Sequence, residues 1–180
     1  DRWDALGIQT LPYSRREGPI LFDGASNKYI HWKGLGIKGE TDIEMWHDWG
    51  QRIVDRIRYH SELDIIYRPR PDNNPVADIR GAEISIGRGI DQDLQCCRLC
   101  VSYGGNIGYD CVIAGVPHFA IGDSIARPLS ETDWSKIDEL FIPSEDDRHQ
   151  WLSDLAYCQW NLDEFHAGDA WRYIRETLNA

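Results

Sequence analysis

The chain has 180 residues, a formal net charge of −11 and 42% hydrophobic residues. This hydrophobic content excludes a disordered chain and is sufficient for one domain with a full core. The acidic balance disfavours a nucleic-acid partner, which needs a long basic face, but it leaves room for a local basic pocket.

The first predicted elements are a buried strand and a long helix. Residues 19–24, PILFDG, form an apolar run that ends in a turn, which predicts the strand. Residues 26–29 are predicted to form the loop that follows it. The capping box at residues 41–44 then begins an amphipathic helix that we expect to end near residue 60.

Two arginines follow the next predicted strand. Residues 63–67 form that strand and lead into Arg68-Pro69-Arg70-Pro71, where the prolines keep the backbone extended. Ligands of open α/β sheets bind at the carboxyl ends of strands, so Arg68 and Arg70 are candidates for binding an anion. The alternative is a surface pair that bridges to acidic side chains. A short strand over residues 82–86 and a short helix over residues 90–94 are predicted next.

The segment from residue 98 to residue 121 has the form of strand, glycine loop, helix and strand. An apolar run over residues 99–101 precedes the turn-rich Tyr103-Gly104-Gly105-Asn106-Ile107-Gly108. Residues 109–114 are predicted to be a helix that Gly115 caps, and residues 118–121 a strand. Glycines at a helix entrance let a ligand approach the backbone, where free N–H groups attract phosphate. The alternative is that they only make a tight turn.

This loop matches neither of two common nucleotide-binding motifs. It lacks the spacing of the dinucleotide fingerprint G-x-G-x-x-G and the Lys-Ser/Thr of a P-loop. The sequence therefore disfavours both NAD and ATP as ligands.

A second polar loop, Gly122-Asp123-Ser124, follows the last predicted strand. Asp123 has the chemistry to accept a sugar hydroxyl, and the alternative is that Asp123 and Ser124 only cap a turn. A helix is then predicted over residues 144–157. A second helix is predicted to begin at the capping box of residues 161–164, and a third to span residues 169–178. We expect the last helix to direct its apolar side chains toward the core, namely Trp171, Ile174 and Leu178.

The cysteines do not form a disulfide framework of the secreted type, because they are odd in number and irregularly spaced. They are Cys96, Cys97, Cys100, Cys111 and Cys158. The single C-x-x-C has no second pair, so we expect buried structural thiols and no metal site. A zinc protein that uses Cys96, Cys97 and Cys100 is the alternative.

Five predicted strands separated by helices and loops imply a mostly parallel sheet that is covered on both faces. The expected fold is therefore a three-layer, Rossmann-like α/β domain that ends in C-terminal helices. We expect it to span residues 19–180 as a single domain, after a polar lead-in or linker over residues 1–18.

Over about residues 19–178 the chain resembles the C-terminal, nucleotide-sugar-binding half of a GT-B glycosyltransferase. The segment Tyr103-Gly104-Gly105-Asn106, with Asp110 and Gly115-Val116-Pro117 after it, is similar to the one that these enzymes place around the donor diphosphate and ribose. Tyr67-Arg68-Pro69-Arg70-Pro71 resembles the "RPHP" segment of bacterial capsule and lipid-sugar transferases, with Arg70 in place of histidine. The stretch from Leu155 to Trp171 resembles the C-terminal tail of phage and bacterial glycosyltransferase-like proteins.

The resemblance implies a glycosyltransferase, or its donor-binding domain, that transfers a sugar from a nucleoside diphosphate sugar to the hydroxyl of an unknown acceptor. The donor is a substrate, and no cofactor is implied. Backbone N–H groups from Gly104 to Gly108 would hold phosphate, and Asp110 stands where the family often has a ribose-binding glutamate. The implied donor-binding residues are Arg68, Arg70, Gly104, Gly105, Asn106, Gly108, Asp110, Asp123 and Ser124.

No catalytic base is assigned, because GT-B enzymes usually carry it in an N-terminal domain and commonly have about twice this length. His118 is conceivable as a base, but we expect a structural histidine. Two other functions stay open, namely a non-catalytic α/β module for a small anion or a partner protein, and a phage-type transferase that glycosylates a modified DNA base. No apolar run approaches the length of a membrane span, and we expect a cytoplasmic protein of a bacterial or phage-infected cell.

Overall fold

The computed structural model describes residues 2–14, 17–36, 42–70 and 78–178, with only the backbone over 42–46. Residue contacts divide the chain into two compact units, one of residues 10–143 and one that combines residues 1–9 with residues 144–180. The sequence did not indicate that the two ends belong to one unit. The expectation of a single domain over residues 19–180 stays a prediction.

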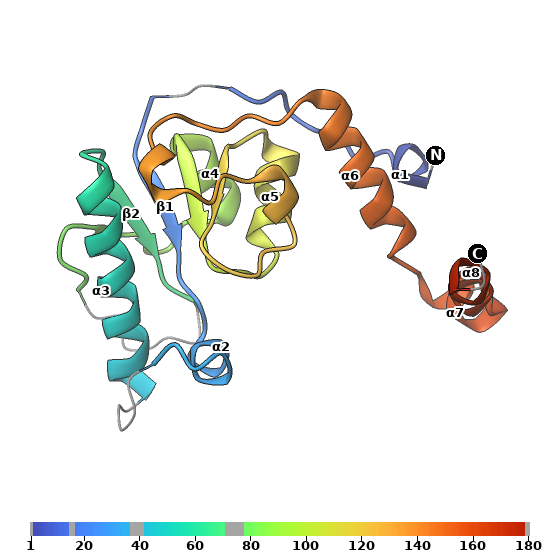
Figure 1. Cartoon of the computed structure of the whole chain (residues 1–180), viewed down its shortest axis with the longest axis horizontal. Coiled ribbons are helices and arrows are strands. Elements are labelled where there is room, and N and C mark those ends of the chain that lie inside the picture. Colours follow the sequence, from blue (N-terminus) through green and yellow to red (C-terminus); the bar gives the residue numbers. More distant parts are fainter. Residues whose placement is uncertain (1, 15–16, 37–41, 71–77, 179–180) are drawn as a thin grey trace. The chain divides into compact units, whose positions relative to one another are not determined.

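The larger unit is built on a five-stranded sheet with the order β3-β2-β1-β4-β5, and every neighbouring pair is parallel (Figure 1). Its strands are β1 (Ile20–Asp23), β2 (Ile65–Arg68), β3 (Glu83–Ile84), β4 (Leu99–Ser102) and β5 (His118–Ala120). In this register Asp23 lies beside Arg68 on one side and Ser102 on the other. Three central strands thus end in polar residues at one edge of the sheet.

Two layers of helices cover the sheet, because alternate strand residues are apolar on both faces. On one face Phe22, Tyr67 and Val101 pack with side chains of α2 (Asn27–Trp32) and α3 (Asp42–His60). On the other face Leu21 and Cys100 pack with α4 (Ile90–Cys96) and α5 (Ile107–Ala114). Figure 1 shows α3 on one side of the strands and α4 with α5 on the other. The predicted three-layer, Rossmann-like α/β fold is confirmed.

Two local predictions change near the edge of the sheet. Helix α2 replaces the loop that we expected over residues 26–29, because Ser26 caps it by accepting from the Tyr29 N–H and Ile30 is fully buried. Helix α5 begins two residues earlier than predicted and ends, as predicted, at Gly115, whose φ is +64°. Two 3₁₀ helices, Arg127–Leu129 and Trp134–Lys136, follow β5.

The smaller unit is helical. It contains α1 (Arg2–Ala5), α6 (Glu145–Tyr157), α7 (Leu162–Ala167) and α8 (Asp169–Leu178), and α1 packs against α6. Helix α1 lies in the stretch that we expected to be irregular. The predicted capping box at Asn161 is confirmed, since its side chain accepts from the Glu164 N–H at 2.9 Å and the Glu164 carboxylate accepts from the Asn161 N–H at 2.8 Å.

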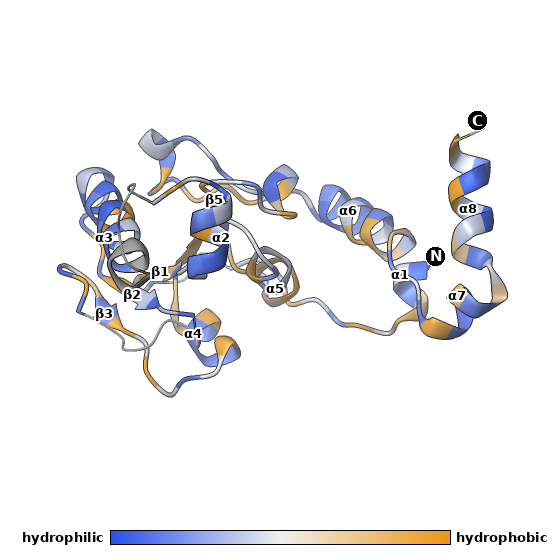
Figure 2. Cartoon of the chain, turned by 90° about the horizontal axis from the view of Figure 1, so that it is seen from below, coloured by the Kyte–Doolittle hydropathy of each residue, from blue (hydrophilic) through white to orange (hydrophobic). Residues whose placement is uncertain are grey.

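The apolar stripe of α8 is less buried than its sequence pattern suggests. Hydrophilic and hydrophobic residues alternate along this helix (Figure 2), which packs against the short helix α7. Trp171 is 67% exposed and Leu178 is 81% exposed, so the expectation that these side chains face a core is wrong. No described helix is both long enough and apolar enough to cross a membrane.

Candidate functional site

A crevice opens where the strand order of the sheet reverses. The chain passes from β1 to β2 and β3 on one side, whereas β4 and β5 lie on the other side of β1. In open α/β sheets, ligands bind outside the carboxyl ends of the strands at such a switch point. A cavity of about 410 Å³ lies at this place, lined by residues that follow β1, β2 and β4.

A second cavity of about 390 Å³ shares three lining residues with the first, namely Asp23, Arg70 and Gly105. Of the predicted donor-binding residues, Arg70, Gly104 and Gly105 line the first cavity. Those that line the second are Arg68, Arg70, Gly105, Asn106 and Asp110. The structure thus brings six of the nine predicted residues together around one crevice.

Arg70 connects the end of β1 to the glycine loop. Its Nε donates to the carbonyl oxygen of Gly24 at 3.1 Å, and its Nη2 lies 3.6 Å from Oδ2 of Asp23. Gly105 has a φ of +84°, and a Cβ added there would come within 2.7 Å of Nη2. Glycine at this position therefore serves both the turn and the close approach of the guanidinium.

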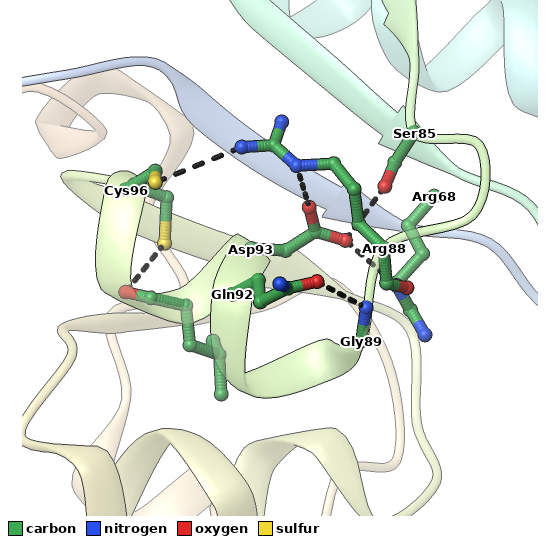
Figure 3. A network of polar contacts seen from close by, with 9 residues as sticks. Arg68, Ser85, Arg88, Gly89, Gln92, Asp93 and Cys96 are labelled. Carbon is green, nitrogen blue, oxygen red and sulfur yellow. Dashed lines mark hydrogen bonds and ion pairs between the residues drawn. The ribbon is translucent and has the colours of Figure 1, made fainter.

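Arg68 has a different environment, although it is only two residues away. Its Nη1 donates to Oδ2 of Asp93 at 2.7 Å and to the carbonyl oxygen of Arg88 at 2.9 Å. Asp93 is fully buried in α4 and also accepts from Ser85 Oγ at 2.7 Å, while Arg88 Nε lies 3.5 Å from its Oδ1 (Figure 3). Arg68 thus takes part in a polar network that links α4 to the ends of β2 and β3.

Two carboxyl groups line the crevice. Asp23 is only 5% exposed, and burial raises its pKa to about 6, while Arg70 and Arg68 act to lower the pKa. Burial also raises the pKa of Asp110, in the first turn of α5, and the carboxylate of Asp91 raises it further. These two carboxyl groups distinguish the crevice from an anion-binding site that is lined by cations alone.

The glycine loop leads into the N-terminus of α5, where Asn106 makes no side-chain cap. The first N–H groups of this helix and its dipole favour an anion. Gly108 lies behind the loop, since a Cβ there would come within 2.7 Å of Ser124 Oγ and 2.8 Å of the Ala126 Cβ. Ser124 is buried and accepts from the Ala126 N–H at 3.3 Å. Gly108 and Ser124 therefore line neither cavity but pack the helix entrance against the loop after β5.

Asp123 lies outside both cavities. Its exposed carboxylate pairs with Lys33 Nζ, and this partner lowers the pKa of Asp123. The Lys33 ammonium also lies 4.7 Å from the centroid of the Trp32 ring. The side chain is thus engaged at the end of α2, while the carbonyl of Asp123 approaches Gly104.

Six residues that line the first cavity were not among the predicted site residues, and Asp23, Tyr29 and Tyr103 are three of them. The two tyrosine rings meet edge to face with centroids 5.7 Å apart, and Tyr103 also meets Trp49 at 6.1 Å. Asp23 had a usable signal, because it is an acidic residue at the end of the central apolar strand. Tyr29 had none, because its place depends on the missed helix α2.

His118 has a structural environment. Its Nε2 lies 2.8 Å from Ser102 Oγ, and its Nδ1 lies 2.6 Å from Ser130 Oγ, which itself donates to the carbonyl of Ala126. Burial lowers the pKa of His118 to about 4, so the ring is neutral near pH 7. This closed chain joins β4, β5 and the first 3₁₀ helix.

The cysteines show no metal-binding arrangement in the part of the chain that the structure describes. Cys96 is exposed, Cys97 and Cys100 are buried, and all five cysteines are free thiols. Over the described ranges no three His, Cys, Asp or Glu side chains form a group that could hold a metal ion.

No family model matches the sequence, and no curated protein does. Among solved structures the chain is similar to KpsC of Thermosulfurimonas dismutans, a beta Kdo 2,7 transferase, with 14% identity, a TM-score of 0.44 and coverage of 81% of this chain and 55% of that one. It is also similar to the spinosyn rhamnosyltransferase SpnG in complex with spinosyn aglycone, with 13% identity, a TM-score of 0.43 and coverage of 83% and 42%. The chain spans about half the length of these proteins.

Proposed function

We propose that the crevice binds a nucleoside diphosphate sugar and that the chain is a glycosyltransferase or its donor-binding domain. The observation that supports this most is the close approach of Arg70 to Gly105, just before the N-terminus of α5. A guanidinium, the backbone of a glycine loop and a helix N-terminus there surround one crevice at the switch point of a parallel sheet.

The proposed reaction needs groups that stabilise the negative charge that develops on the departing nucleoside diphosphate. The proposed donors are Arg70 and the N–H groups of the loop at Gly104, Gly105 and Asn106, which line the crevice, because fixed donors stabilise charge that develops during bond breaking. Asp110 is the proposed partner of the ribose hydroxyls, since it borders the same cavity. Arg68, Gly108 and Ser124 would act indirectly by holding the crevice in shape.

A non-catalytic anion-binding module is the second candidate. It is favoured by the environment of His118, the one base that the sequence suggested, because this ring is buried in a closed hydrogen-bond chain and lines neither cavity. Both candidates predict binding of a phosphorylated ligand, and only the first predicts transfer of a sugar.

Isothermal titration with UDP-glucose, GDP-mannose and a wider panel of nucleotide sugars tests the proposal. Arg70→Ala should weaken binding by roughly 10- to 100-fold, because a charge-assisted hydrogen bond contributes about 1.5–3 kcal/mol. Arg172→Ala is the matched control, since that exposed arginine pairs with Asp169 in the smaller unit. Failure of every nucleotide sugar to bind at millimolar concentration would contradict the proposal, and binding without transfer or hydrolysis would favour the module.

A further inference from the structure

Asp23 is a buried carboxylate that is incompletely paired among the described residues. It is 5% exposed, and its one ion pair among the described residues is with Arg70, at 3.6 Å, which is longer than a hydrogen bond. No described group donates a hydrogen bond to its carboxylate. The comparison with Asp93 is direct, because that buried carboxylate accepts from both Ser85 and Arg68 at 2.7 Å.

Asp23 lies where the two cavities of the crevice adjoin. Asp23, Arg70 and Gly105 are the three residues that line both cavities, so a ligand that spans the crevice passes over all three. An anionic group that pairs with Arg70 therefore comes to lie next to the carboxyl group. Two neighbouring negative charges repel each other, and burial already disfavours the ionised form of Asp23.

We propose that Asp23 is a ligand-binding residue of the diphosphate site, and that it binds as the neutral carboxylic acid by donating a hydrogen bond to a phosphate oxygen. This inference rests on the proposed function. Binding of the donor then takes up one proton from solvent, which ends on Oδ1 or Oδ2 of Asp23, and no covalent bond of the ligand changes. Arg70 pairs with the phosphate charge in place of the carboxylate.

The charges around Asp23 are compatible with this role. Burial already raises its pKa to about 6, so protonation near neutral pH requires only a modest further shift. The ionisable groups that act on it or that it acts on come from β2, the segment after β2, α4, α5 and β4; they are Arg68, Arg70, Asp93, Asp110, Cys100 and Cys111. An anion that neutralises Arg70 removes one of the two cations that favour the ionised carboxylate.

Titration calorimetry with UDP-glucose tests the proposal on the whole chain. Both phosphates of this ligand are diesters, so neither titrates between pH 5 and 8. At pH 7.5, in two buffers with different ionisation enthalpies, we expect an uptake of about one proton for each ligand bound. The affinity should fall by roughly tenfold for each pH unit above 6.5, because the binding-competent acid form becomes rarer by that factor.

Asp23→Asn supplies a side chain of the same shape that is always neutral. It should bind UDP-glucose without proton uptake, with an affinity that is independent of pH, and roughly 10- to 30-fold more tightly than the wild type at pH 7.5. Asp110→Asn is the control, because it removes the other carboxylate of the crevice. It should weaken binding through the proposed ribose contact but leave the uptake of one proton for each ligand bound in place.

The outcomes separate the inference from the function. Binding by the wild type without proton uptake, or an uptake that Asp110→Asn abolishes, overturns the role of Asp23 and leaves the proposed function standing. No binding of any nucleotide sugar overturns both. If Asp23→Asn fails to fold, as judged by circular dichroism, the proton uptake and pH dependence of the wild type decide.

Discussion

Among the described residues at the carboxyl end of the sheet, Arg68 and Asp93 form the closest arginine–carboxylate pair, with Nη1 and Oδ2 2.7 Å apart. The pair joins the end of β2 to the middle of α4, and Asp93 is completely buried there. Because a buried carboxylate and its partners depend on one another, the network of Figure 3 determines both the stability of this edge and the position of Arg68 beside the crevice.

Replacement of Asp93 should destabilise the fold strongly. Asp93→Ala leaves Ser85 and Arg68 without their shared acceptor, and we expect a loss of about 3 kcal/mol in the free energy of unfolding. Asp91→Ala is the control in the same helix, because Asp91 is exposed and should cost less than about 1 kcal/mol. Urea denaturation measures both, and similar losses in the two variants would contradict the assigned role of the network.

Alanine substitutions of the two arginines in the Arg68-Pro69-Arg70 segment should reduce stability by different amounts. Arg68→Ala leaves Asp93 buried without its main cation and should cost about 3 kcal/mol of stability. Arg70→Ala should cost only about 1 kcal/mol, because Asp23 can take up a proton when its cation is removed. Thermal and urea unfolding at pH 7.5 give the comparison, and an equal loss in both variants would show that Arg70 is also structural.

Gly105→Ala should impair binding more than folding. The φ of +84° makes any side chain unfavourable by about 1–2 kcal/mol, and the new Cβ would displace the end of the Arg70 side chain. Gly87→Ala has the same unfavourable backbone conformation, with a φ of +71°, but a Cβ added there has no described neighbour within 4 Å. We expect similar losses of stability in the two variants, measured by urea unfolding, and a loss of donor affinity only in Gly105→Ala. An unchanged affinity in Gly105→Ala would separate Arg70 from the binding site.

His118 should make the protein less stable in acid. Its pKa is about 4 in the fold and about 6.5 in an unfolded chain, so the unfolded state binds more protons between these values. Its contribution to stability is therefore present above pH 6.5 and is lost as the pH falls toward 4. Asp23 acts in the opposite direction, because its raised pKa favours the fold at low pH and that contribution is lost as the pH rises through 6.

The two effects can be distinguished by substitution. His118→Gln should remove the part of the acid-dependent loss that comes from the histidine, whereas His31→Gln, at an exposed position, should leave the pH dependence unchanged. Urea unfolding at pH 7.5, 6 and 5 measures the slopes. A slope for His118→Gln equal to that of the wild type would show that this ring does not govern the dependence.

Sequence reasoning identified the crevice but not the different environments of its two arginines. Residues 63–67 were predicted as a strand that leads into Arg68, and a strand end at a parallel sheet is where ligands bind, but β2 includes Arg68 and ends there, whereas Arg70 lies beyond the strand. Residues two apart in a strand point to the same face, so Arg68 follows Ile66 toward α4 and meets Asp93. That partner lies 25 residues away along the chain, and only the folded packing of α4 brings it there.

Other errors have the same origin in packing between distant parts. Helix α2 was missed because six residues carry too little periodicity, and its stability comes from Ile30 in the core. The bounds of helix α8 were predicted correctly, but the spacing of its apolar residues does not indicate whether Trp171 is buried or exposed. Periodicity in a sequence specifies a helix and its two faces, and the neighbour that covers a face must be known from the fold.

The pairing of α1 with α6 has a consequence for the order of folding. Trp3 is buried in α1 and Arg2 donates to Glu164 in α7, so the partners of α1 follow the whole sheet in the sequence. During synthesis the sheet can assemble before these partners emerge from the ribosome, whereas α1 must wait for α6 and α7. A truncation at either terminus alone would thus leave the opposite terminus without its packing partner.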